Sequence, residues 1–349
     1  MIEDKNADNQ YTPLENIGEF GLIERIAKAT ARGLDTTVKG IGDDAAVIDH
    51  SDLQTVVTTD CLVENVHFDF TYTPLKHLGY KSIAVNISDL AAMGAKPTSV
   101  LVSIAASNRM SVEALEEIYS GMQLACERYN VEIVGGDTTS SLSGLMISIT
   151  AMGTVEKDKA IYREGAQPHE LIVVTGDLGA AYAGLQVLER EKAVFKDNPH
   201  LQPDLSEYEY LLQRLLKPEA RVDILPMLED LELRPTAMLD ISDGLSSELL
   251  HLCKASGLGC KIFEDKLPVD PAVFKVCEEM QLNATTAAIN GGEDYELLMT
   301  LPLYAHEKIK GNPHFTVIGH MTQENDPPLL VTNTGEMLPL KAQGWNSFQ

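Results

Sequence analysis

Aspartates that end or interrupt short apolar runs are the residues of this 349-residue chain best suited to do chemistry. A surface acid usually has polar neighbours, whereas these acids stand beside glycines or strand-like segments. The six motifs are Gly42-Asp43-Asp44, Thr58-Thr59-Asp60, Asn86-Ile87-Ser88-Asp89, Gly135-Gly136-Asp137, Asp240-Ile241-Ser242-Asp243-Gly244 and Gly291-Gly292-Glu293-Asp294. Carboxylates that are brought together repel one another unless cations compensate. Because carboxylate and hydroxyl oxygens are the ligands of hard cations, the recurrence predicts a magnesium site.

Glycine pairs beside two of these motifs indicate a phosphate ligand. Gly135-Gly136 follows a predicted strand and Gly291-Gly292 precedes another, and glycine lets the backbone approach a ligand closely. Backbone N–H groups in such loops can hold phosphate oxygens. Magnesium combined with phosphate indicates phosphoryl transfer, in which metal ions neutralise the phosphate oxygens.

The motifs of the commoner nucleotide and metal sites are absent or out of context. Gly40-Ile41-Gly42-Asp43-Asp44-Ala45 matches the dinucleotide fingerprint, but strand-like sequence follows it instead of the required helix. The chain has no P-loop and no protein-kinase catalytic loop. Its nine histidines include no H-x-x-x-H pair for zinc. The five cysteines, odd in number and without a C-x-x-C pair, indicate reduced thiols.

The overall charge excludes two kinds of partner. The 52 acidic and 27 basic residues give a net charge of −25, which argues against nucleic acid and anionic membranes. No apolar run approaches the length of a transmembrane helix, and the acidic first twenty residues hold no apolar signal core. We therefore expect a cytoplasmic protein that acts on small molecules.

Alternating helical and strand-like segments must position the acids. Helical periodicity predicts helices over Glu19–Ala31, Pro74–Met93, Ser111–Tyr129, Gly179–Leu188, Tyr208–Leu228, Gly244–Ala255 and Pro271–Met280. Short β-rich runs predict strands over Ala45–Ile48, Thr55–Thr58, Val100–Ala105, Val131–Val134, Leu145–Met152, Leu171–Val174, Thr236–Leu239, Cys260–Phe263 and Tyr295–Leu301. This mixture predicts an α/β or α+β fold.

The length favours two domains, and the pattern breaks into charged and glycine-containing sequence around Thr154–Gln167. We therefore expect a disordered tail over residues 1–17, a first domain over 18–156 and a second over 157–349. The stretch Glu189–Glu209 is polar and loosely patterned.

Taken in order, the motifs resemble those of the thiamine-monophosphate kinase family, from about Gly18 to the C-terminus. The segments that carry the resemblance are Gly40–Asp44, Thr58–Phe68, Ala84–Gly94, Gly135–Thr139, Tyr162–Ala166, Asp240–Leu245, Gly291–Leu297 and Gly344–Phe348. The glycine–aspartate segments also occur in related ATP-binding synthetases.

The resemblance implies a two-domain fold like that of aminoimidazole ribonucleotide synthetase. In that fold two N-terminal domains pair across a homodimer into a β-barrel, ATP lies in a groove near the barrel, and the C-terminal α/β domain contributes metal and substrate residues. The implied reaction is transfer of the γ-phosphate of ATP to thiamine monophosphate, assisted by several magnesium ions.

The resemblance also assigns roles to individual residues. The metal ligands would be Asp44, Thr58, Thr59, Asp60, Asp89, Asp137, Asp240 and Asp243. The nucleotide contacts would be Tyr119, Gly136, Asp137, Arg163 and Ser242. The substrate contacts would be His67, Glu293 and Trp345, and the residues closest to catalysis would be Asp60, Asp137, Asp243 and Arg163.

Physical reasoning gives some of these residues two interpretations each. Arg163 could supply fixed positive charge at a phosphate, or pair at the surface with Glu164. Trp345 could stack on a cationic ring, or pack at the C-terminus. A lone histidine such as His67 is more often structural than ligand-binding.

Two other functions stay open at the level of sequence. The first is a synthetase of the same fold with another acceptor. A selenophosphate enzyme would carry a reactive cysteine in an N-terminal glycine-rich loop, and no cysteine precedes Cys61. The second is a binding protein without catalysis, which would be expected to have lost some of the acids.

Overall fold

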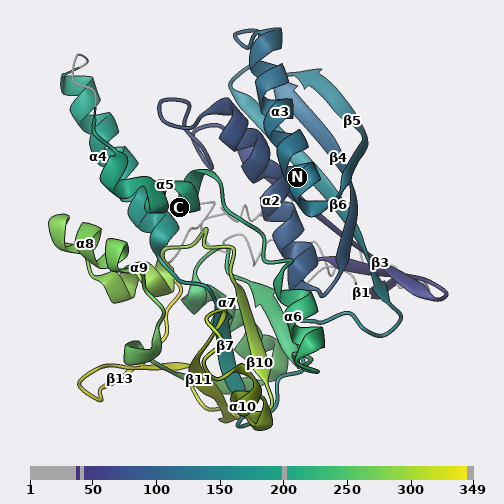
Figure 1. The fold of residues 1–349 in the computed structure, drawn as a ribbon, viewed down its shortest axis with the longest axis vertical. Helices are drawn as coiled ribbons and strands as arrows, with labels where there is room; N and C mark the ends of the chain where they lie inside the picture. The colour runs from purple at the N-terminus through teal and green to yellow at the C-terminus, as the bar shows by residue number, and fades with distance from the viewer. Residues whose placement is uncertain (1–36, 40–42, 199–202, 344–349) are drawn as a thin grey trace, which may run out of the picture.

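The computed structural model describes residues 37–39, 43–198 and 203–343, which form two β-sheets with helices packed on them (Figure 1). The strands of the first sheet all precede residue 157, and those of the second all follow residue 170. The expected mixed α/β fold is confirmed, and on this basis we propose the division of the chain at 156/157. The expected tail over residues 1–17 and the helix over Glu19–Ala31 lie outside the described residues.

The first sheet has six strands in the order β1-β2-β3-β6-β4-β5. Every neighbouring pair is antiparallel except β4 and β5, which run parallel. The strands span Thr37–Lys39 (β1), Ala46–His50 (β2), Leu53–Val63 (β3), Lys96–Ala106 (β4), Glu132–Ser140 (β5) and Leu145–Glu156 (β6). Within the described residues no strand joins β1 to β5, so the sheet of a single chain is open.

Helices α2 (Leu75–Ala92) and α3 (Val112–Tyr129) cover one face of this sheet (Figure 1). Buried residues alternate along β6, where Ile147 and Ile149 join the same core as Ile87 of α2, as expected for a half-buried strand. The opposite face carries partly exposed residues, which include the apolar side chains of Leu53, Leu101 and Met146. Among the described residues, no helix covers this second face.

Close packing of α2 against α3 depends on glycine. A Cβ atom on Gly121 of α3 would lie 1.9 Å from the carbonyl oxygen of Lys76. The start of α3 was predicted correctly: the Ser111 hydroxyl accepts a hydrogen bond from the Ala114 N–H at 3.2 Å, which satisfies a free donor of the first turn.

The second sheet has seven strands in the order β13-β12-β9-β11-β7-β10-β8. They span Leu171–Thr175 (β7), Ala237–Asp240 (β8), Leu258–Phe263 (β9), Leu297–Leu301 (β10), Phe315–Glu324 (β11), Leu329–Val331 (β12) and Met337–Pro339 (β13). The helices of this half span Ala180–Asp197 (α4), Glu209–Leu216 (α5), Ile224–Asp230 (α6), Leu245–Ser256 (α7), Pro271–Glu279 (α8), Ala284–Asn290 (α9) and His306–Ile309 (α10).

Both faces of the central part of the second sheet are covered, which explains why β7, β8 and β10 are largely apolar. On β7, Ile172 and Val174 share a core with α7 and α9, whereas Leu171 and Val173 share a core with α6 and α10. Every residue of β7, β8 and β10 is buried.

The structure extends several predicted elements and adds others. Helix α4 continues beyond the predicted end at Leu188 to Asp197, into the stretch that looked loosely patterned. The helices predicted through Tyr208–Leu228 are α5 and α6, which are separate because Pro218 cannot continue α5. Elements β1, α9, α10, β11, β12 and β13 were not predicted. None of the described helices is both long enough and apolar enough to cross a lipid bilayer.

Candidate active site

Helix α2 organises the site because its polar side chains contact residues from both halves of the chain. The Ser88 hydroxyl donates to Asp240 Oδ2 at 2.6 Å, and Asp89 Oδ2 accepts from the Thr58 hydroxyl at 2.6 Å. The Asn86 side-chain oxygen accepts from the backbone N–H of Asp60 at 3.0 Å. One helix therefore ties strand β3 to the end of strand β8.

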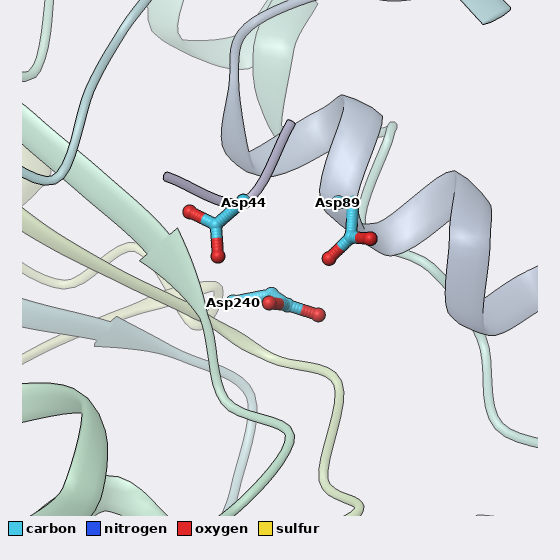
Figure 2. Close-up of side chains that lie close together, drawn as sticks. All are labelled: Asp44, Asp89 and Asp240. Carbon is cyan, nitrogen blue, oxygen red and sulfur yellow. The ribbon is translucent and has the colours of Figure 1, made fainter. Parts of the chain in front are cut away.

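Three aspartates from separate elements meet beside α2. Figure 2 shows Asp44, Asp89 and Asp240 around a common point, and each offers an oxygen within 4.8 Å of the other two. Asp44 precedes β2, Asp89 is in the last turns of α2, and Asp240 ends β8. Carboxylates this close repel one another unless protons or cations intervene.

Burial raises the pKa values of all three carboxyls, and neighbouring carboxylates add to the effect. Burial is the larger cause in each case, and it raises the pKa of Asp240 to about 7, with Asp44 adding to the effect. The pKa of Asp89 is raised well above its ordinary value by burial and by Asp60, Asp240 and Asp44. The pKa of Asp44 is raised by burial, although the Arg163 guanidinium opposes this.

The donor set of this cluster fits a divalent cation. All its ligand atoms are oxygens, the Asp44 side chain is only 2% exposed, and Asp44 Oδ2 has no hydrogen-bond partner among the described residues. An orphaned buried carboxylate oxygen is costly unless a cation or proton satisfies it. The hard oxygen ligands favour magnesium over softer metals.

Arg163 lies against the cluster. Its guanidinium forms an ion pair with Asp44, and its Nε lies 3.9 Å from Asp43 Oδ1. Burial lowers the pKa of Arg163, but the Asp44 carboxylate more than offsets burial, so the pKa is raised and the charge is fixed. Glu164, the alternative partner, accepts instead from Lys39 at 3.0 Å.

One cavity of about 1330 Å³ brings together most of the predicted site residues. Its wall includes Asp44, Thr58, Thr59, Asp60, His67, Asp89, Arg163, Asp240, Ser242, Asp243 and Glu293. These residues come from both sheets and from α2, so the cavity lies between the two halves of the chain.

Thr59 differs from its neighbours in orientation. Thr58 is buried on the α2 side of β3, whereas Thr59 is exposed and its hydroxyl donates to the Ile149 carbonyl oxygen at 2.9 Å. Successive strand residues point to opposite faces. A metal contact from Thr59 would therefore involve its backbone carbonyl oxygen.

Three predicted residues line a second, smaller cavity instead. Tyr119, Gly136 and Asp137 border a hollow of about 520 Å³ on α3 and the edge strand β5. Asp60 and Gly136 occupy one row across the sheet, separated by β6 and β4. Three strand spacings make that separation about 14 Å. Asp137 is therefore not part of the Asp44–Asp89–Asp240 cluster within one chain.

Packing within the sheet accounts for one of the two glycine pairs. A Cβ on Gly136 would lie 1.8 Å from the carbonyl oxygen of Val102 on β4, so only glycine fits there. Gly136 therefore allows close packing of β5 against β4, which explains this glycine without a ligand. Gly292, by contrast, lines the large cavity with a φ of +72°, which glycine adopts without steric cost.

Trp345 lies outside the described residues. His67 lines the large cavity, and its Nδ1 accepts a hydrogen bond from the Val63 backbone N–H at 3.0 Å. That contact fixes the ring next to the loop that follows β3.

Comparisons with known proteins identify the family. Residues 42–155 match the family model for the AIR synthase related protein, N-terminal domain. A thiamine-monophosphate kinase of Bacillus subtilis is 33% identical over 337 residues, which cover 95% of this chain and 99% of that protein. The chain belongs to the thiamine-monophosphate kinase family. The Aquifex aeolicus relative of the same name is 36% identical over 316 residues, covering 89% of this chain and 93% of that protein.

Solved structures agree with this family. The structure of AaThiL complexed with AMPPCP and TMP has a TM-score of 0.82 at 32% identity and covers 97% of this chain and 99% of that one. E. coli HypE, a hydrogenase maturation protein, has a TM-score of 0.64 at 19% identity over 84% of this chain and 88% of its own. The second likeness concerns the fold alone.

The motifs did not indicate two residues, Glu248 and Asn86, that contact the acidic segments of the site. Glu248 is 4% exposed, and its Oε1 accepts from the Asp243 backbone N–H at 3.2 Å. Burial, with Asp243 and Asp240 nearby, raises the pKa of Glu248 well above its ordinary value. Its position five residues after Asp243, in the first turns of a predicted helix, was the available signal.

Asn86 belongs to one of the acidic motifs, and the motif alone did not indicate its contact with Asp60. It precedes Asp89 by three residues, and such pairs share one face of a helix. Its amide also donates to the Ser82 carbonyl oxygen at 3.0 Å. The side-chain oxygen is thereby oriented toward Asp60, so helical spacing alone could have assigned Asn86 to the site.

Proposed function

We propose that the protein transfers the γ-phosphate of ATP to thiamine monophosphate, producing thiamine diphosphate and ADP. The observation that carries the proposal is the Asp44–Asp89–Asp240 cluster in one cavity with Arg163 and Glu293. Two polyanions must meet for this reaction, so a site that gathers cations is required. The AaThiL structure, complexed with AMPPCP and TMP, supports the same pair of ligands for this chain.

Several magnesium ions would be held by oxygen ligands of the large cavity. The Asp44, Asp89 and Asp240 carboxylates fit one ion directly, and Thr58, Asp60 and Asp243 border the same space. Magnesium bound there would supply positive charge that offsets the negative charge of the phosphate oxygens. The fit rests on the all-oxygen donor set and the orphaned Asp44 oxygen.

The chain's own residues bind and orient the reactants. Arg163 is held by Asp44 and offers a permanently charged guanidinium to a phosphate. The acceptor is itself an ionised phosphate, whose oxygen is a competent nucleophile. We therefore propose direct in-line transfer without a dedicated general base, in which Asp60 and Asp243 act by holding cations and Arg163 by stabilising charge.

The acceptor would bind on the side of the cavity that holds His67 and Glu293. With Nδ1 of His67 accepting from Val63, a contact to the substrate would come from Nε2. The Glu293 carboxylate would face the cationic rings of thiamine monophosphate. We propose Trp345, in the C-terminal motif, as a further contact through stacking.

A homodimer would complete the nucleotide site. Asp137 lies on the open face of the first sheet, opposite Ser103 of β4. The exposed residues of this face include the large apolar side chains of Leu101 and Met146 as well as Cys61 and Ser103. A second copy covering this face, as in a shared β-barrel, would enclose Asp137 between two subunits. Tyr119, Gly136, Asp137 and Ser242 would then contact ATP, with Asp137 also contacting metal.

A cytoplasmic location fits this function. All five cysteines are unpaired, as expected for thiols in a reducing compartment where ATP is available.

A product assay with the purified chain tests the proposal. Incubation with ATP, thiamine monophosphate and magnesium is expected to yield thiamine diphosphate and ADP in equal amounts, and chelation of the metal is expected to abolish both. The absence of thiamine diphosphate would contradict the proposal. Release of ADP with a different acceptor only, from a panel that includes phosphoribosyl and selenide substrates, would favour a synthetase of the same fold.

A further inference from the structure

A buried lysine on α2 has no part in the reaction described so far. Lys81 is 4% exposed, yet it lines the large cavity. Lys81, Val85 and Asp89 all line that cavity and are spaced four residues apart, which places them on one face of the helix. Eight residues of helix separate Lys81 from Asp89 by about 12 Å. Lys81 is therefore about two helical turns away from Asp89 along α2.

The partner of Lys81 is Glu293. Lys81 Nζ lies 2.8 Å from Glu293 Oε1 and donates to Oε2 at 2.9 Å. This contact joins α2, in the first half of the chain, to the loop that precedes β10 in the second. A buried ammonium group is strongly disfavoured without an anion beside it. The burial of Lys81 therefore depends on Glu293, and the orientation of Glu293 depends on Lys81.

The loop that carries Glu293 has a strained backbone, which hydrogen bonds hold in place. The φ of Glu293 is 57°, and that of Tyr295 is 52°, both in the left-handed region that non-glycine residues rarely adopt. Two backbone hydrogen bonds hold the loop: the Glu293 N–H donates to the Ser242 carbonyl oxygen at 2.6 Å, and the Tyr295 N–H donates to that of Ile241 at 2.9 Å. These bonds fix the backbone but not the carboxylate.

Two other cations in the cavity wall, Arg163 and Lys192, are engaged elsewhere. Arg163 pairs with Asp44, and Lys192 pairs with Asp69 at 2.7 Å. No ion pair connects either of these two cations to Glu293 in the part of the chain that the structure describes.

We propose that Lys81 is a positioning residue for the acceptor: its ammonium group fixes the Glu293 carboxylate in the geometry that receives the cationic rings of the substrate. The inference rests on the proposed function and deepens it. A positioning role differs from a purely structural tie between the two halves of the chain, because it predicts a selective effect on one substrate.

Steady-state kinetics of Lys81→Met, Lys81→Arg and Glu293→Gln test the inference. In Lys81→Met the KM for thiamine monophosphate is expected to rise by about tenfold or more, since loss of a buried ion-pair partner costs at least about 1.4 kcal/mol. The KM for ATP and kcat are expected to change by less than about twofold. Lys81→Arg keeps the charge and is expected to recover most of the affinity.

A double-mutant cycle separates positioning from direct contact. If Lys81 acts through Glu293, Lys81→Met is expected to add no further increase in KM in the Glu293→Gln background. Lys217→Met is a matched control, because Lys217 pairs with Glu219 at 3.4 Å and does not line the cavity. Its KM for thiamine monophosphate is expected to equal that of the unchanged chain.

Each of the following outcomes would overturn the inference. If the original chain is active and Lys81→Met has the same KM for thiamine monophosphate, the inference is wrong but the proposed function stands. A parallel rise in the KM for ATP would have the same consequence. So would a further rise in the KM for thiamine monophosphate when Lys81→Met is added to Glu293→Gln. Failure of the unchanged chain to form thiamine diphosphate would overturn the proposed function and the inference together. If Lys81→Met does not fold, the kinetics of Lys81→Arg decide, since an arginine that folds but does not restore affinity contradicts charge-based positioning.

Discussion

Asp89 is a buried carboxylate among three acidic neighbours, and this arrangement weakens the metal-free folded state. Burial and the charges of Asp60, Asp240 and Asp44 together raise its pKa well above the ordinary value. Sites built for function often reduce stability in this way. The electrostatic cost disappears when protons or cations enter the cluster, and both can be tested.

The stability of the metal-free protein is predicted to rise as the pH falls from about 7 to about 4. The pKa of Asp240 is raised from 3.8 to about 7 by burial and by Asp44. The folded state then binds a proton that the unfolded state does not hold in this range, so acidification favours folding. Thermal unfolding in the presence of a chelator measures the effect, with a Tm change of about 2–4 °C for each kcal/mol.

Asp240→Asn provides the control for this prediction. The amide cannot ionise, so the variant is expected to be more stable than the original chain at pH 7 and to gain less on acidification. Saturating magnesium at pH 7 is expected to raise the Tm of the original chain more than that of the variant. If magnesium raises the Tm of both proteins equally, Asp240 does not contribute to metal binding.

Asp60→Asn is predicted to lower kcat by about a hundredfold or more, the scale for losing a group that stabilises transition-state charge. The Asp60 backbone N–H still donates to Asn86 in the variant, so the Tm is expected to change little. Asp52→Asn, in the exposed turn between β2 and β3, is the matched substitution and is expected to keep full activity. Near-normal turnover of Asp60→Asn would remove Asp60 from the site.

Sequence predicts the chemistry of individual residues better than their grouping. Asp44, Asp89 and Asp240 were recognisable from their apolar and glycine neighbours, and the structure brings them together. Asp137 has the same local sequence but borders another cavity, because strand order is not visible in local pattern. Lys81 was missed because α2 is buried on nearly every side, so periodicity does not indicate which polar residue faces a cavity.

Among the elements, α2 sets the geometry of the site, and its position depends on α3. The two helices touch through Gly79 and Gly121. A Cβ on Gly79 would lie 1.9 Å from the Ile118 carbonyl oxygen, as close as the corresponding contact of Gly121 with Lys76. Backbones this close leave no room for a methyl group.

Gly121→Ala is therefore predicted to destabilise the protein by about 1–3 kcal/mol, the usual cost of overpacking. The displaced α2 would also move Asp89, so the affinity for magnesium is expected to fall. Chemical denaturation and metal titration measure the two effects. Ser120→Ala, at an exposed position of α3, is the control and is expected to leave both unchanged. Unaltered stability of Gly121→Ala would contradict the close crossing.

Elements with strong local signals were predicted, and those that depend on distant partners were not. Both α2 and α3 were predicted to within a residue or so of their observed ends. Strand β11 was missed because its residues gain their pairing only from β7 and β9, which are more than fifty residues away. The second half of α4 is largely polar, so sequence alone ended that helix too early.

At the scale of the whole molecule, the open face of the first sheet is the feature that a single chain does not explain. Ser148 lies near its centre, beside Cys61 of β3 and Ser103 of β4. Ser148→Arg is predicted to prevent dimer formation, because a large charged side chain cannot be buried there without a partner. Light scattering after gel filtration measures the mass.

Gln123→Arg introduces the same charge at an exposed position of α3 and is expected to remain dimeric. If Ser148→Arg has the mass of the unchanged chain, the open face is not the interface. Loss of ATP affinity together with the dimer would support a nucleotide site shared between subunits.

Anomalous scattering from manganese is the most direct test of the account. Crystals grown with manganese, AMPPCP and thiamine monophosphate are predicted to contain an anomalous peak bonded to oxygens of Asp44, Asp89 and Asp240. Manganese accepts the same hard oxygen ligands as magnesium. Peaks located only elsewhere, with these three carboxylates contacting no ion, would contradict the claim that they gather cations between two phosphates.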